Sequence, residues 1–531
     1  MKRSAEICDW EFSIPALEYS KNVRLPHTWN VVDETMNYRG EGIYTAKVFL
    51  SEAQRDKKVF LCFGAAYHSA DIYVNGVFAG CHHSGYTPFE IEITPFIHFG
   101  EENQIKVTVN NTPSDQILPY NREFDWADDG GLIRKVTLCF HDTDDISELD
   151  VSYDLYGFSD THCDGQIFVS AAFYDKQSRE AQITLIDPKT DNVILEEKQV
   201  LGTESAVLRF KELELWQPEN PKLYRLIVRT KTDTVIRKIG LRSMDINKGT
   251  VLLNGKRIFL KGCEWMPGSH PDYGMAEPLS HSVKCLSQLK KSGCVFTRFH
   301  WQQDDAILDW CDENGLMVQE EIPYWGLPKV ATDLQVNIAK QQADEMVKHH
   351  KHHPSVICWG IGNELDGTSE DTIAYVDELY SYVKALDPGR FVNYVSDTLG
   401  KPENECKDDA TLHGDIAMWN DYLGLWQPCE DIEWRIWKTA KRCWDKPLII
   451  SEFGLCEPAF EGGDKRRSEI LEQRVSIYKQ ISNISGYVWF SLNDYRTQYG
   501  EYGEGKFRRR IHGSTDLYGN KKPSYQILCR L

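Results

Sequence analysis

Residues 355–367, Ser-Val-Ile-Cys-Trp-Gly-Ile-Gly-Asn-Glu-Leu-Asp-Gly, decide how this sequence is interpreted. An apolar run of strand-forming residues leads directly to the polar pair Asn363-Glu364. A second stretch, residues 447–454, reads Pro-Leu-Ile-Ile-Ser-Glu-Phe-Gly and places Glu452 after another apolar run. Short apolar runs bounded by glycine are typical of buried strands. Each glutamate is therefore predicted to stand where a buried strand ends.

Strand-like and helix-like segments alternate around these two stretches. The predicted helices include 280–292, 304–313, 337–352 and 369–386. The predicted strands are 257–262, 294–298, 316–320, 356–360, 391–395, 410–413, 447–450 and 487–490. Eight strands that alternate with helices predict a (β/α)8 TIM barrel over residues 244–531, with its active site at the carboxyl ends of the strands. By this count Glu364 follows the fourth strand and Glu452 the seventh, so both carboxyl groups face the same end.

The first half of the chain has a different pattern, with short β-rich runs separated by turn signals. Residues 1–142 are predicted to form a jelly-roll β-sandwich, in which Asn75-Gly76 marks a two-residue hairpin. Residues 143–243 are predicted to form an immunoglobulin-like β-sandwich. The expected fold class is therefore multidomain, with two β-sandwiches before an α/β barrel.

Composition restricts the classes of partner. The 531 residues are 41% hydrophobic and 26% charged, as in ordinary soluble proteins, and carry a formal net charge of −20. Such a charge disfavours nucleic acid and anionic membranes as partners. The start of the chain lacks a signal-peptide pattern, and the 15 cysteines are scattered without Cys-x-x-Cys pairs. We therefore expect a cytoplasmic protein with reduced cysteines.

Two carboxyl groups at one end of a barrel suit the hydrolysis of a glycosidic bond. One protonates the leaving oxygen, and the other attacks the anomeric carbon or activates a water molecule. Other side chains are predicted at the same end, and they include Arg298, His300, Gln319-Glu-Glu321, His413, Trp489 and Asn493-Asp494. Arg298 would lower the pKa of a nearby carboxyl group, although an ordinary ion pair is an equal alternative. The histidines are either substrate ligands or satisfied core residues.

Two basic clusters have more than one interpretation. His349-His350 and His352-His353 precede Pro354 and offer no closed ligand set in sequence, so a solvated helix terminus is favoured over a metal site. The run Phe507 to Arg510 is interpreted as a charged surface segment, with an anion clamp as the alternative.

The chain resembles glycoside hydrolase family 2, which contains β-galactosidases, β-glucuronidases and β-mannosidases. The resemblance spans nearly the whole chain and rests on an ordered series of short motifs. They are Leu25-Pro-His-Thr-Trp29, Gly85-Tyr-Thr-Pro-Phe89, Gly130-Gly-Leu-Ile-Arg134, Pro221-Lys-Leu-Tyr224, Leu253-Asn-Gly-Lys256, Asn363-Glu364-Leu and Ser451-Glu452-Phe-Gly454.

The resemblance implies a role for each site residue. Glu364 would be the general acid/base and Glu452 the nucleophile of a retaining mechanism. Asn363 would hold the 2-hydroxyl group of the sugar, and Arg298 would keep Glu452 ionised. The remaining implied contacts come from Tyr422, which would hydrogen-bond the nucleophile, and Trp489, which would form the floor of the sugar subsite; His300 and His413 complete the predicted substrate-binding set.

The sequence departs from the family at positions that bear on the substrate. Gln319-Glu-Glu and Gly262-Cys-Glu replace the motifs that hold a metal ion in the large β-galactosidases, so we expect no required metal or other cofactor. The Asn-Lys pair at 520–521 resembles the uronate grip of β-glucuronidases but lies in a different segment, so we interpret it as coincidence. Whether Arg508 to Arg510 bind a uronate stays open.

These observations predict a retaining exo-β-glycosidase that acts on a terminal neutral sugar. A β-galactoside is the first candidate and a β-glucuronide the second, followed by a β-mannoside or arabinoside. A non-hydrolytic carbohydrate-binding protein is the alternative from another class. The expected partner is an oligosaccharide or glycoside, with no nucleic acid or membrane partner and with a possible homo-oligomer.

Overall fold

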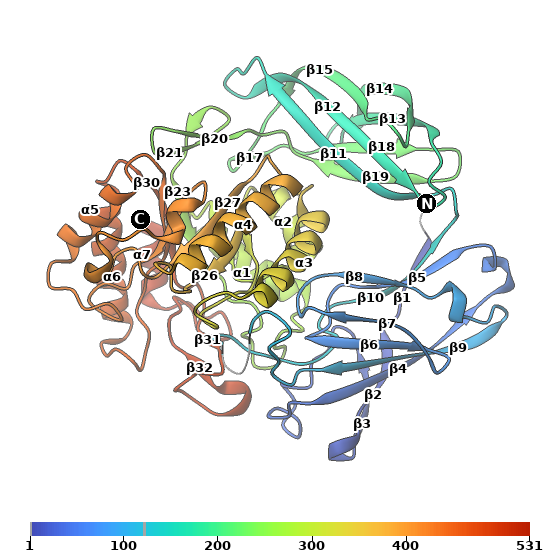
Figure 1. The fold of residues 1–531 in the computed structure, drawn as a ribbon, viewed down its shortest axis with the longest axis horizontal. Coiled ribbons are helices and arrows are strands. Elements are labelled where there is room, and N and C mark those ends of the chain that lie inside the picture. The colour runs from blue at the N-terminus through green and yellow to red at the C-terminus, as the bar shows by residue number, and fades with distance from the viewer. Residues whose placement is uncertain (1–2, 121–123) are drawn as a thin grey trace.

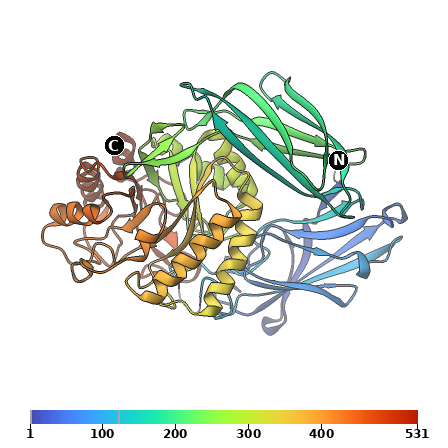
Figure 2. The same cartoon turned by 45° about the horizontal axis from the view of Figure 1, so that its top comes forward.

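The computed structural model describes residues 3–120 and 124–531. Figure 1 shows three bodies: a first β-sandwich drawn in blue, a second drawn in teal and green, and a helix-coated barrel in yellow to red. Figure 2 shows the same three bodies after rotation, with the barrel in contact with both sandwiches. The predicted fold class is confirmed: a first β-sandwich and an immunoglobulin-like β-sandwich precede an eight-stranded parallel TIM barrel.

The first sandwich packs a six-stranded sheet, in the order β3-β2-β4-β9-β6-β7, against a four-stranded sheet, β1-β10-β5-β8. Asn75 and Gly76 both have positive φ, 51° and 80°, as a two-residue hairpin between β6 and β7 requires. The predicted hairpin is therefore confirmed. The strands are β1 Arg3–Glu6, β2 Asp9–Ile14, β3 Tyr19–Arg24, β4 Glu41–Leu50, β5 Lys58–Phe63, β6 Ser69–Val74, β7 Val77–His83, β8 Phe89–Glu92, β9 Glu101–Asn110 and β10 Val136–His141.

The second sandwich has a three-stranded sheet, β11-β12-β15, facing a four-stranded sheet, β14-β13-β18-β19. Alternate residues point inward: Ile167, Val169, Ile183 and Leu185 are fully buried, while their neighbours are partly exposed. The strands are β11 Ile146–Tyr156, β12 His162–Phe173, β13 Arg179–Asp187, β14 Asn192–Leu201, β15 Ala206–Glu214, β18 Tyr224–Arg229 and β19 Thr234–Ile239.

The barrel closes through parallel pairs from β23 to β30. Its strands are almost wholly buried, as expected when helices cover the outside and side chains fill the interior. The strands are β23 Leu260–Cys263, β24 Phe296–Phe299, β25 Met317–Glu321, β26 Val356–Asn363, β27 Phe391–Ser396, β28 Ala417–Asn420, β29 Leu448–Glu452 and β30 Ile484–Trp489. The helices are α1 Leu279–Lys291, α2 Asp305–Asn314, α3 Asp333–His350, α4 Glu370–Leu386, α5 Ile432–Arg442, α6 Gly463–Tyr478 and α7 Pro523–Arg530.

The sequence prediction of the sixth strand was wrong. Residues Ala410–His413 form a short 3-10 helix, and the barrel strand is β28, seven residues further on. Asp409 explains the difference, because its carboxylate accepts a hydrogen bond from the backbone N–H of Thr411 and stabilises a helical turn.

Three contacts fix the sandwiches to the barrel. In the first sandwich, Nε2 of His82 lies 3.2 Å from the Glu345 carboxylate on α3. In the second, Arg242 donates to the backbone oxygens of Pro354 and Val356, at 2.6 Å each. Arg496, from the segment after β30, forms a buried ion pair with Asp129 of the first sandwich at 2.6 Å. The first sandwich is thereby held close to the carboxyl end of the barrel.

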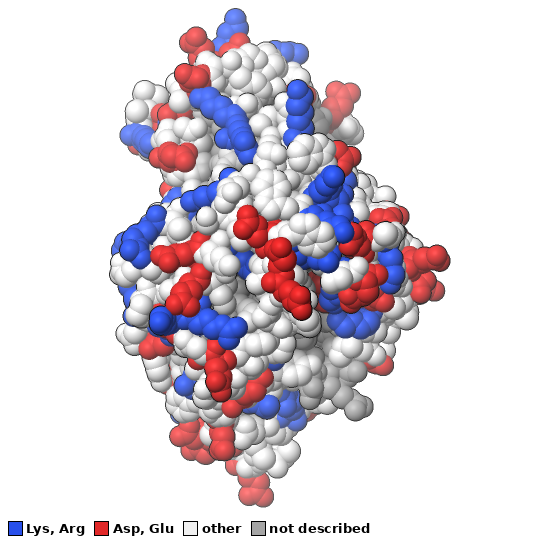
Figure 3. Space-filling view, turned by 90° about the vertical axis from the view of Figure 1, so that its left-hand side faces the viewer, with Lys and Arg blue, Asp and Glu red and all other residues white. Residues whose placement is uncertain are grey.

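The surface carries mixed charges. Basic and acidic side chains are interspersed over the barrel face in Figure 3. Within the described ranges no helix is long and apolar enough to cross a membrane.

Candidate active site

Glu452 stands at the carboxyl end of β29 and is surrounded by hydrogen-bond donors. Its Oε1 accepts from Nη1 of Arg298 at 2.8 Å, and its Oε2 accepts from the Tyr422 hydroxyl at 2.9 Å. Nε2 of His300 lies 3.4 Å from Oε1. Burial alone would raise the pKa of this carboxyl group, but the His300 hydrogen bond and the Arg298 charge outweigh burial and lower it. Glu452 is therefore ionised at neutral pH.

Arg298 is a buried cation shared between carboxylates. Its Nε and Nη2 donate to the two oxygens of Glu321, at 2.9 and 2.8 Å, while Nη1 binds Glu452. Nη1 also lies 3.8 Å from Oε2 of Glu264. The planar guanidinium fork explains why arginine, with donors on two edges, occupies this position. Sequence analysis identified Arg298 but missed Glu264 and Glu321 as its partners.

His300 bridges two of these carboxylates. Nδ1 contacts Oε1 of Glu264, and Nε2 faces Glu452. Burial opposes protonation of the imidazole, but the charge of Glu264 and the hydrogen bonds to Glu264 and Glu452 dominate and raise the pKa of His300 to about 10. The side chain is 6% exposed and reaches the pocket wall. His300 therefore adds a second positive charge beside Glu452.

Glu364 follows β26 in a contrasting environment. Nε1 of Trp325 donates to its Oε2 at 3.0 Å, and Nδ2 of Asn420 donates to its Oε1 at 2.7 Å. Both donors are neutral, so they do not offset burial as Arg298 does for Glu452. Burial, followed by repulsion from the Glu452 charge, raises the pKa of Glu364 to about 7. Glu364 therefore keeps a proton to a much higher pH than Glu452.

The backbone at Glu364 is in the left-handed region, with φ of 56°. A non-glycine residue at positive φ is uncommon, and such positions cluster where function fixes the backbone. The turn aims the Glu364 carboxyl group into the pocket that also contains Glu452.

Asn363, one residue earlier, is 1% exposed and brings an unused donor to the same place. Its Oδ1 accepts from Nδ2 of Asn420 at 3.2 Å, whereas its own Nδ2 has no hydrogen-bond partner among the described residues. Buried donors without a partner are costly. A ligand hydroxyl group bound beside Glu364 would satisfy this one.

The pocket at this end of the barrel has a volume of about 300 Å³. Its wall includes two residues from the first sandwich, Asp125 and Trp126. Trp426, whose side chain is 50% exposed, stands at the mouth. The other lining residues are Met266, His300, Trp325, Glu364, Asp397, Lys401, Tyr422, Gln427, Glu452, Phe490, Tyr495, Tyr499, Arg510 and His512.

The cationic side chains that line the described pocket, other than His300, are already paired. Nη1 of Arg510 donates to Oδ2 of Asp125 at 2.6 Å, and Nζ of Lys401 donates to Asp397 at 2.8 Å. Asp125 also accepts from the hydroxyl groups of Tyr495 and Thr497 at 2.9 and 2.8 Å. Arg510 therefore belongs to the pocket, contrary to the surface interpretation of its run, whereas the Arg508 and Arg509 side chains do not line the pocket.

Two predicted site residues lie elsewhere. His413 is on the 3-10 helix and pairs with Asp377 and Asp408, at 2.7 and 3.0 Å, outside the pocket. Trp489 is fully buried behind the wall, where Nε1 donates to the Ser514 hydroxyl at 2.9 Å. Its neighbour Phe490 lines the pocket instead. The expected roles of His413 as a substrate ligand and of Trp489 as the subsite floor are therefore corrected.

A metal ion does not fit this set of residues. Glu264, His300 and Glu452 offer ligand atoms within 4.8 Å of one another. The Arg298 guanidinium, however, already binds Glu452 and lies against Glu264. A divalent cation would meet this positive charge, and Mg²⁺ prefers six oxygen ligands in octahedral geometry.

The fold and the paired carboxyl groups define a three-domain glycoside hydrolase. The family models agree: the sugar binding domain, the central domain and the TIM barrel domain of glycosyl hydrolases family 2 match residues 8–141, 146–242 and 244–501. The chain belongs to glycoside hydrolase family 2 and is an enzyme of that family.

Its relatives carry two different names. A β-galactosidase of Thermoanaerobacterium thermosulfurigenes is 27% identical over 94% of this chain and 70% of its own length. A β-glucuronidase of Bacteroides fragilis is 28% identical over 84% of this chain and 67% of its own. Other curated relatives match over 47% to 87% of their own length. Among solved structures, a β-D-glucuronidase of Dictyoglomus thermophilum superposes with a TM-score of 0.88 and 23% identity, covering 100% of this chain and 96% of that one.

Proposed function

We propose that the chain is a retaining exo-β-glycosidase that removes a terminal neutral sugar, with a β-galactoside as the first candidate substrate. One observation carries the proposal: two carboxyl groups line the same pocket in opposite electrostatic environments. Pairs of titratable groups whose environments push their pKa values apart divide the roles of acid and nucleophile.

In the first step, an oxygen of ionised Glu452 attacks the anomeric carbon while Glu364 donates its proton to the leaving oxygen. The glycosidic bond breaks, a glycosyl ester forms on Glu452, and the aglycone departs as an alcohol. In the second step, Glu364 removes a proton from a water molecule that attacks the same carbon. The ester bond to Glu452 breaks, and the free sugar leaves with its β configuration retained.

Neutral and charged side chains have separate tasks in this cycle. Arg298 and His300 stabilise Glu452 as an anion before attack and as a leaving group afterwards. Asn363 donates its unused Nδ2 hydrogen to a sugar hydroxyl group. Tyr422 holds Oε2 of Glu452, so that the carboxylate keeps one orientation. Preorganised donors of this kind are worth more in a water-poor site than in bulk water.

The charge of the pocket favours a neutral sugar. Arg510 and Lys401 are each neutralised by a carboxylate, and Asp125 would repel a uronate group placed against Arg510. The volume of about 300 Å³ is at the lower end for small-molecule sites, which suits a single sugar ring and hence exo action.

A panel of 4-nitrophenyl glycosides tests the assignment. We expect the highest kcat/KM with the β-galactoside, a much lower value with the β-glucuronide, and no activity with any member after Glu452→Ala. A wild-type enzyme that prefers the β-glucuronide would overturn the neutral-sugar assignment but leave the glycosidase intact. Sugar binding by calorimetry without turnover of any member would instead identify a non-hydrolytic binding protein.

A β-glucuronidase is the second candidate, favoured by Arg510 in the pocket wall and by the names of several relatives. Asp125→Asn distinguishes the two, because it removes the charge that engages Arg510 without changing the side-chain shape. For a galactosidase this change lowers activity on the galactoside and raises activity on the glucuronide. For a glucuronidase whose Asp125 only orients Arg510, activity on the glucuronide falls.

A further inference from the structure

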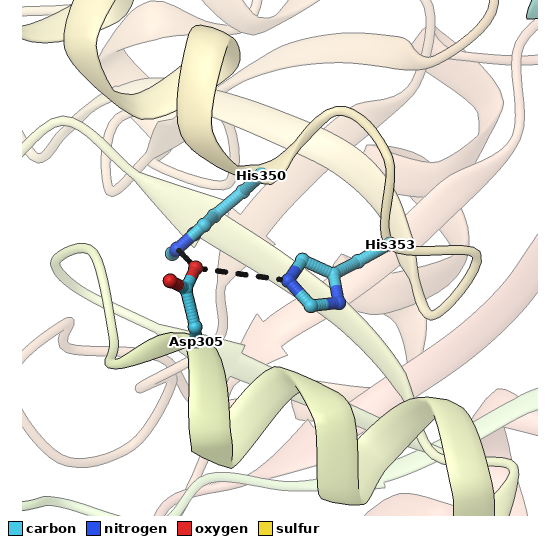
Figure 4. Close-up of side chains that lie close together, drawn as sticks. All are labelled: Asp305, His350 and His353. Carbon is cyan, nitrogen blue, oxygen red and sulfur yellow. Dashed lines mark ion pairs between the residues drawn. The ribbon is translucent and has the colours of Figure 1, made fainter. Parts of the chain in front are cut away.

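Two buried imidazoles converge on one carboxylate outside the catalytic pocket. Figure 4 shows His350, at the end of α3, and His353, in the loop that follows, both directed toward Asp305 at the start of α2. Nε2 of His350 lies 3.1 Å from Oδ1 of Asp305, and Nε2 of His353 lies 3.9 Å from the same oxygen. Both histidines are 1% exposed. The expectation of a solvated helix terminus is therefore wrong for these two residues.

A second carboxylate holds the far side of each ring. Nδ1 of His350 lies 2.5 Å from Oε2 of Glu320, and Nδ1 of His353 lies 2.6 Å from Oδ2 of Asp312. A carboxylate that accepts the Nδ1 hydrogen leaves the lone pair on Nε2 and fixes the ring orientation. Histidines that bind metal ions are oriented in this way. Here both Nε2 atoms point to the Asp305 oxygen.

Two buried polar atoms at this cluster lack a partner. Nε2 of His353 and Oε1 of Gln302 have no hydrogen bond among the described residues. The amide nitrogen of Gln302 is 3.4 Å from both ring nitrogens of His350. Buried polar atoms are usually satisfied, because a missing hydrogen bond costs about 1–3 kcal/mol. Their position beside three converging donors indicates a ligand among them.

The donor set and its spacing fit zinc. The ligand atoms of Asp305, His350 and His353 lie within 4.8 Å of one another. Tetrahedral Zn²⁺ with bonds of about 2.0–2.1 Å separates its ligands by roughly 3.3 Å, between the two measured distances. Three carboxylates, those of Asp305, Asp312 and Glu320, surround the two imidazoles, so the cluster has more acidic than basic groups and a divalent cation would offset the excess negative charge. Two imidazoles with one carboxylate form a ligand set that occurs in zinc sites, whereas Mg²⁺ prefers oxygen ligands.

We infer that Asp305, His350 and His353 bind a Zn²⁺ ion, with Glu320 and Asp312 orienting the two imidazoles. None of the three ligands lines the catalytic pocket, so the ion is structural. It joins α2 to the end of α3 and to His353, which lies three positions before the strand β26 that carries Asn363. The Asp305 side chain is 60% exposed, which gives the ion a route from solvent and leaves room for water as a fourth ligand.

Zinc binding by the full-length protein tests this inference. The protein is treated with a chelator and transferred to metal-free buffer. Zinc chloride is then titrated into it by calorimetry, and the bound zinc per chain is measured by inductively coupled plasma mass spectrometry. We expect one zinc ion per chain, no binding of Mg²⁺, and a zinc-dependent rise in Tm. Asp305→Asn, an isosteric change at an exposed position, should weaken zinc binding by at least about ten-fold and remove the rise in Tm.

Two further variants make the result specific. Glu313→Gln removes a neighbouring exposed carboxylate of α2 that pairs with Lys238, and should bind zinc as the wild type does. Glu264→Gln disrupts the carboxylate–histidine group of the catalytic pocket and should also keep its zinc. The inference is overturned if the chelated wild type takes up no stoichiometric zinc, or if Asp305→Asn and His350→Gln bind it unchanged. Loss of zinc in Glu264→Gln alone would place the ion in the catalytic pocket and equally overturn it.

Discussion

Nη1 of Arg298 lies 2.8 Å from Oε1 of Glu452, and the arginine side chain is fully buried. The opposite edge of the same guanidinium binds Glu321, which holds the cation in place whether or not Glu452 carries a charge. The charge that lowers the pKa of Glu452 is therefore held in place by Glu321, which does not line the pocket. Preorganisation of this kind requires no rearrangement when the glycosyl ester forms or breaks.

Arg298→Lys tests this arrangement. Lysine keeps the positive charge but cannot bind Glu321 and Glu452 through one planar group. We expect kcat/KM to fall by roughly 10²-fold, an effect of the size seen when one preorganised donor is lost, and the acidic limb of the pH profile to move upward because the pKa of Glu452 rises. If kcat/KM and the acidic limb of the pH profile were both unchanged, a positive charge beside Glu452 would be sufficient without the planar guanidinium group.

Glu364→Ala should separate substrates by their leaving groups. Without a proton donor, alkyl and poorly activated aryl glycosides should lose about 10²–10⁴-fold in kcat, the usual contribution of general acid catalysis. A glycoside with a strongly acidic phenol needs no proton, so its first step should be nearly unaffected. We would measure kcat for aryl glycosides that differ in the pKa of their phenol. For Glu364→Ala, kcat should depend more steeply on the phenol pKa than it does for the wild type. An equal loss for every leaving group would argue against Glu364 as the acid.

The pH dependence of kcat/KM follows from the two pKa shifts. Activity requires Glu364 protonated and Glu452 ionised. The pKa of Glu364 is raised to about 7, so activity should fall about ten-fold per unit as pH rises above that value. The pKa of Glu452 is lowered, so the acidic limb should lie below the ordinary range of a glutamate. Initial rates at low substrate concentration from pH 3 to 9 would measure both limbs, and Glu364→Gln should abolish the basic one.

Stability should depend on pH through the same residue. The pKa of Glu364 is higher in the folded protein than in the unfolded chain, so folding favours its protonated form. This contribution is fully present below the unfolded pKa, near 4.5, and is lost as pH rises through about 7. The free energy of unfolding of the wild type should therefore decline by roughly 1–3 kcal/mol relative to Glu364→Gln over that interval. Urea titrations of both proteins at pH 4.5, 6 and 8 would measure the difference; parallel curves would contradict it.

Trp426 offers an exposed aromatic face at the mouth of the pocket, beyond the catalytic carboxyl groups. We expect it to contact the aglycone, because aromatic rings pack well against sugar and phenyl faces. Trp426→Ala should raise KM for aryl glycosides by about three- to ten-fold, corresponding to roughly 1 kcal/mol of lost packing, with little change in kcat. Trp434→Ala removes an equally exposed tryptophan of α5 that does not line the pocket and should change neither constant.

Local signals in the sequence were sufficient for the fold and for the residues at strand ends. Asn363, Glu364 and Glu452 follow long apolar runs, so strand counting alone placed them at one end of the barrel. His413 was misplaced because Leu412 beside a threonine resembles a short strand, whereas the Asp409 cap makes the segment helical. Whether this segment forms a helix or a strand depended on a single side-chain hydrogen bond, which the hydrophobic periodicity of the sequence does not reveal.

Partners that meet only in the folded chain could not be predicted. The sequence placed Glu321 at a strand end on the site face, but nothing local showed that Glu264 and Glu321 meet Arg298. His350 and His353 have the spacing of a helix end, and only the packing of α2 brings Asp305 to them. Asp125 belongs to another domain altogether. In each case the missing information is a contact between segments far apart in the sequence.

Asp125 and Trp126 come from the first sandwich, yet they form part of the wall of the pocket that contains Glu364 and Glu452. The barrel alone holds Glu364 and Glu452, so under the proposed function a barrel joined to a different sandwich would keep both carboxyl groups while losing part of the pocket wall. Changes of substrate in such a chain can therefore arise by recombination at the domain level, without any substitution in the barrel. The pocket wall is therefore shared between two domains, although only one of them carries Glu364 and Glu452.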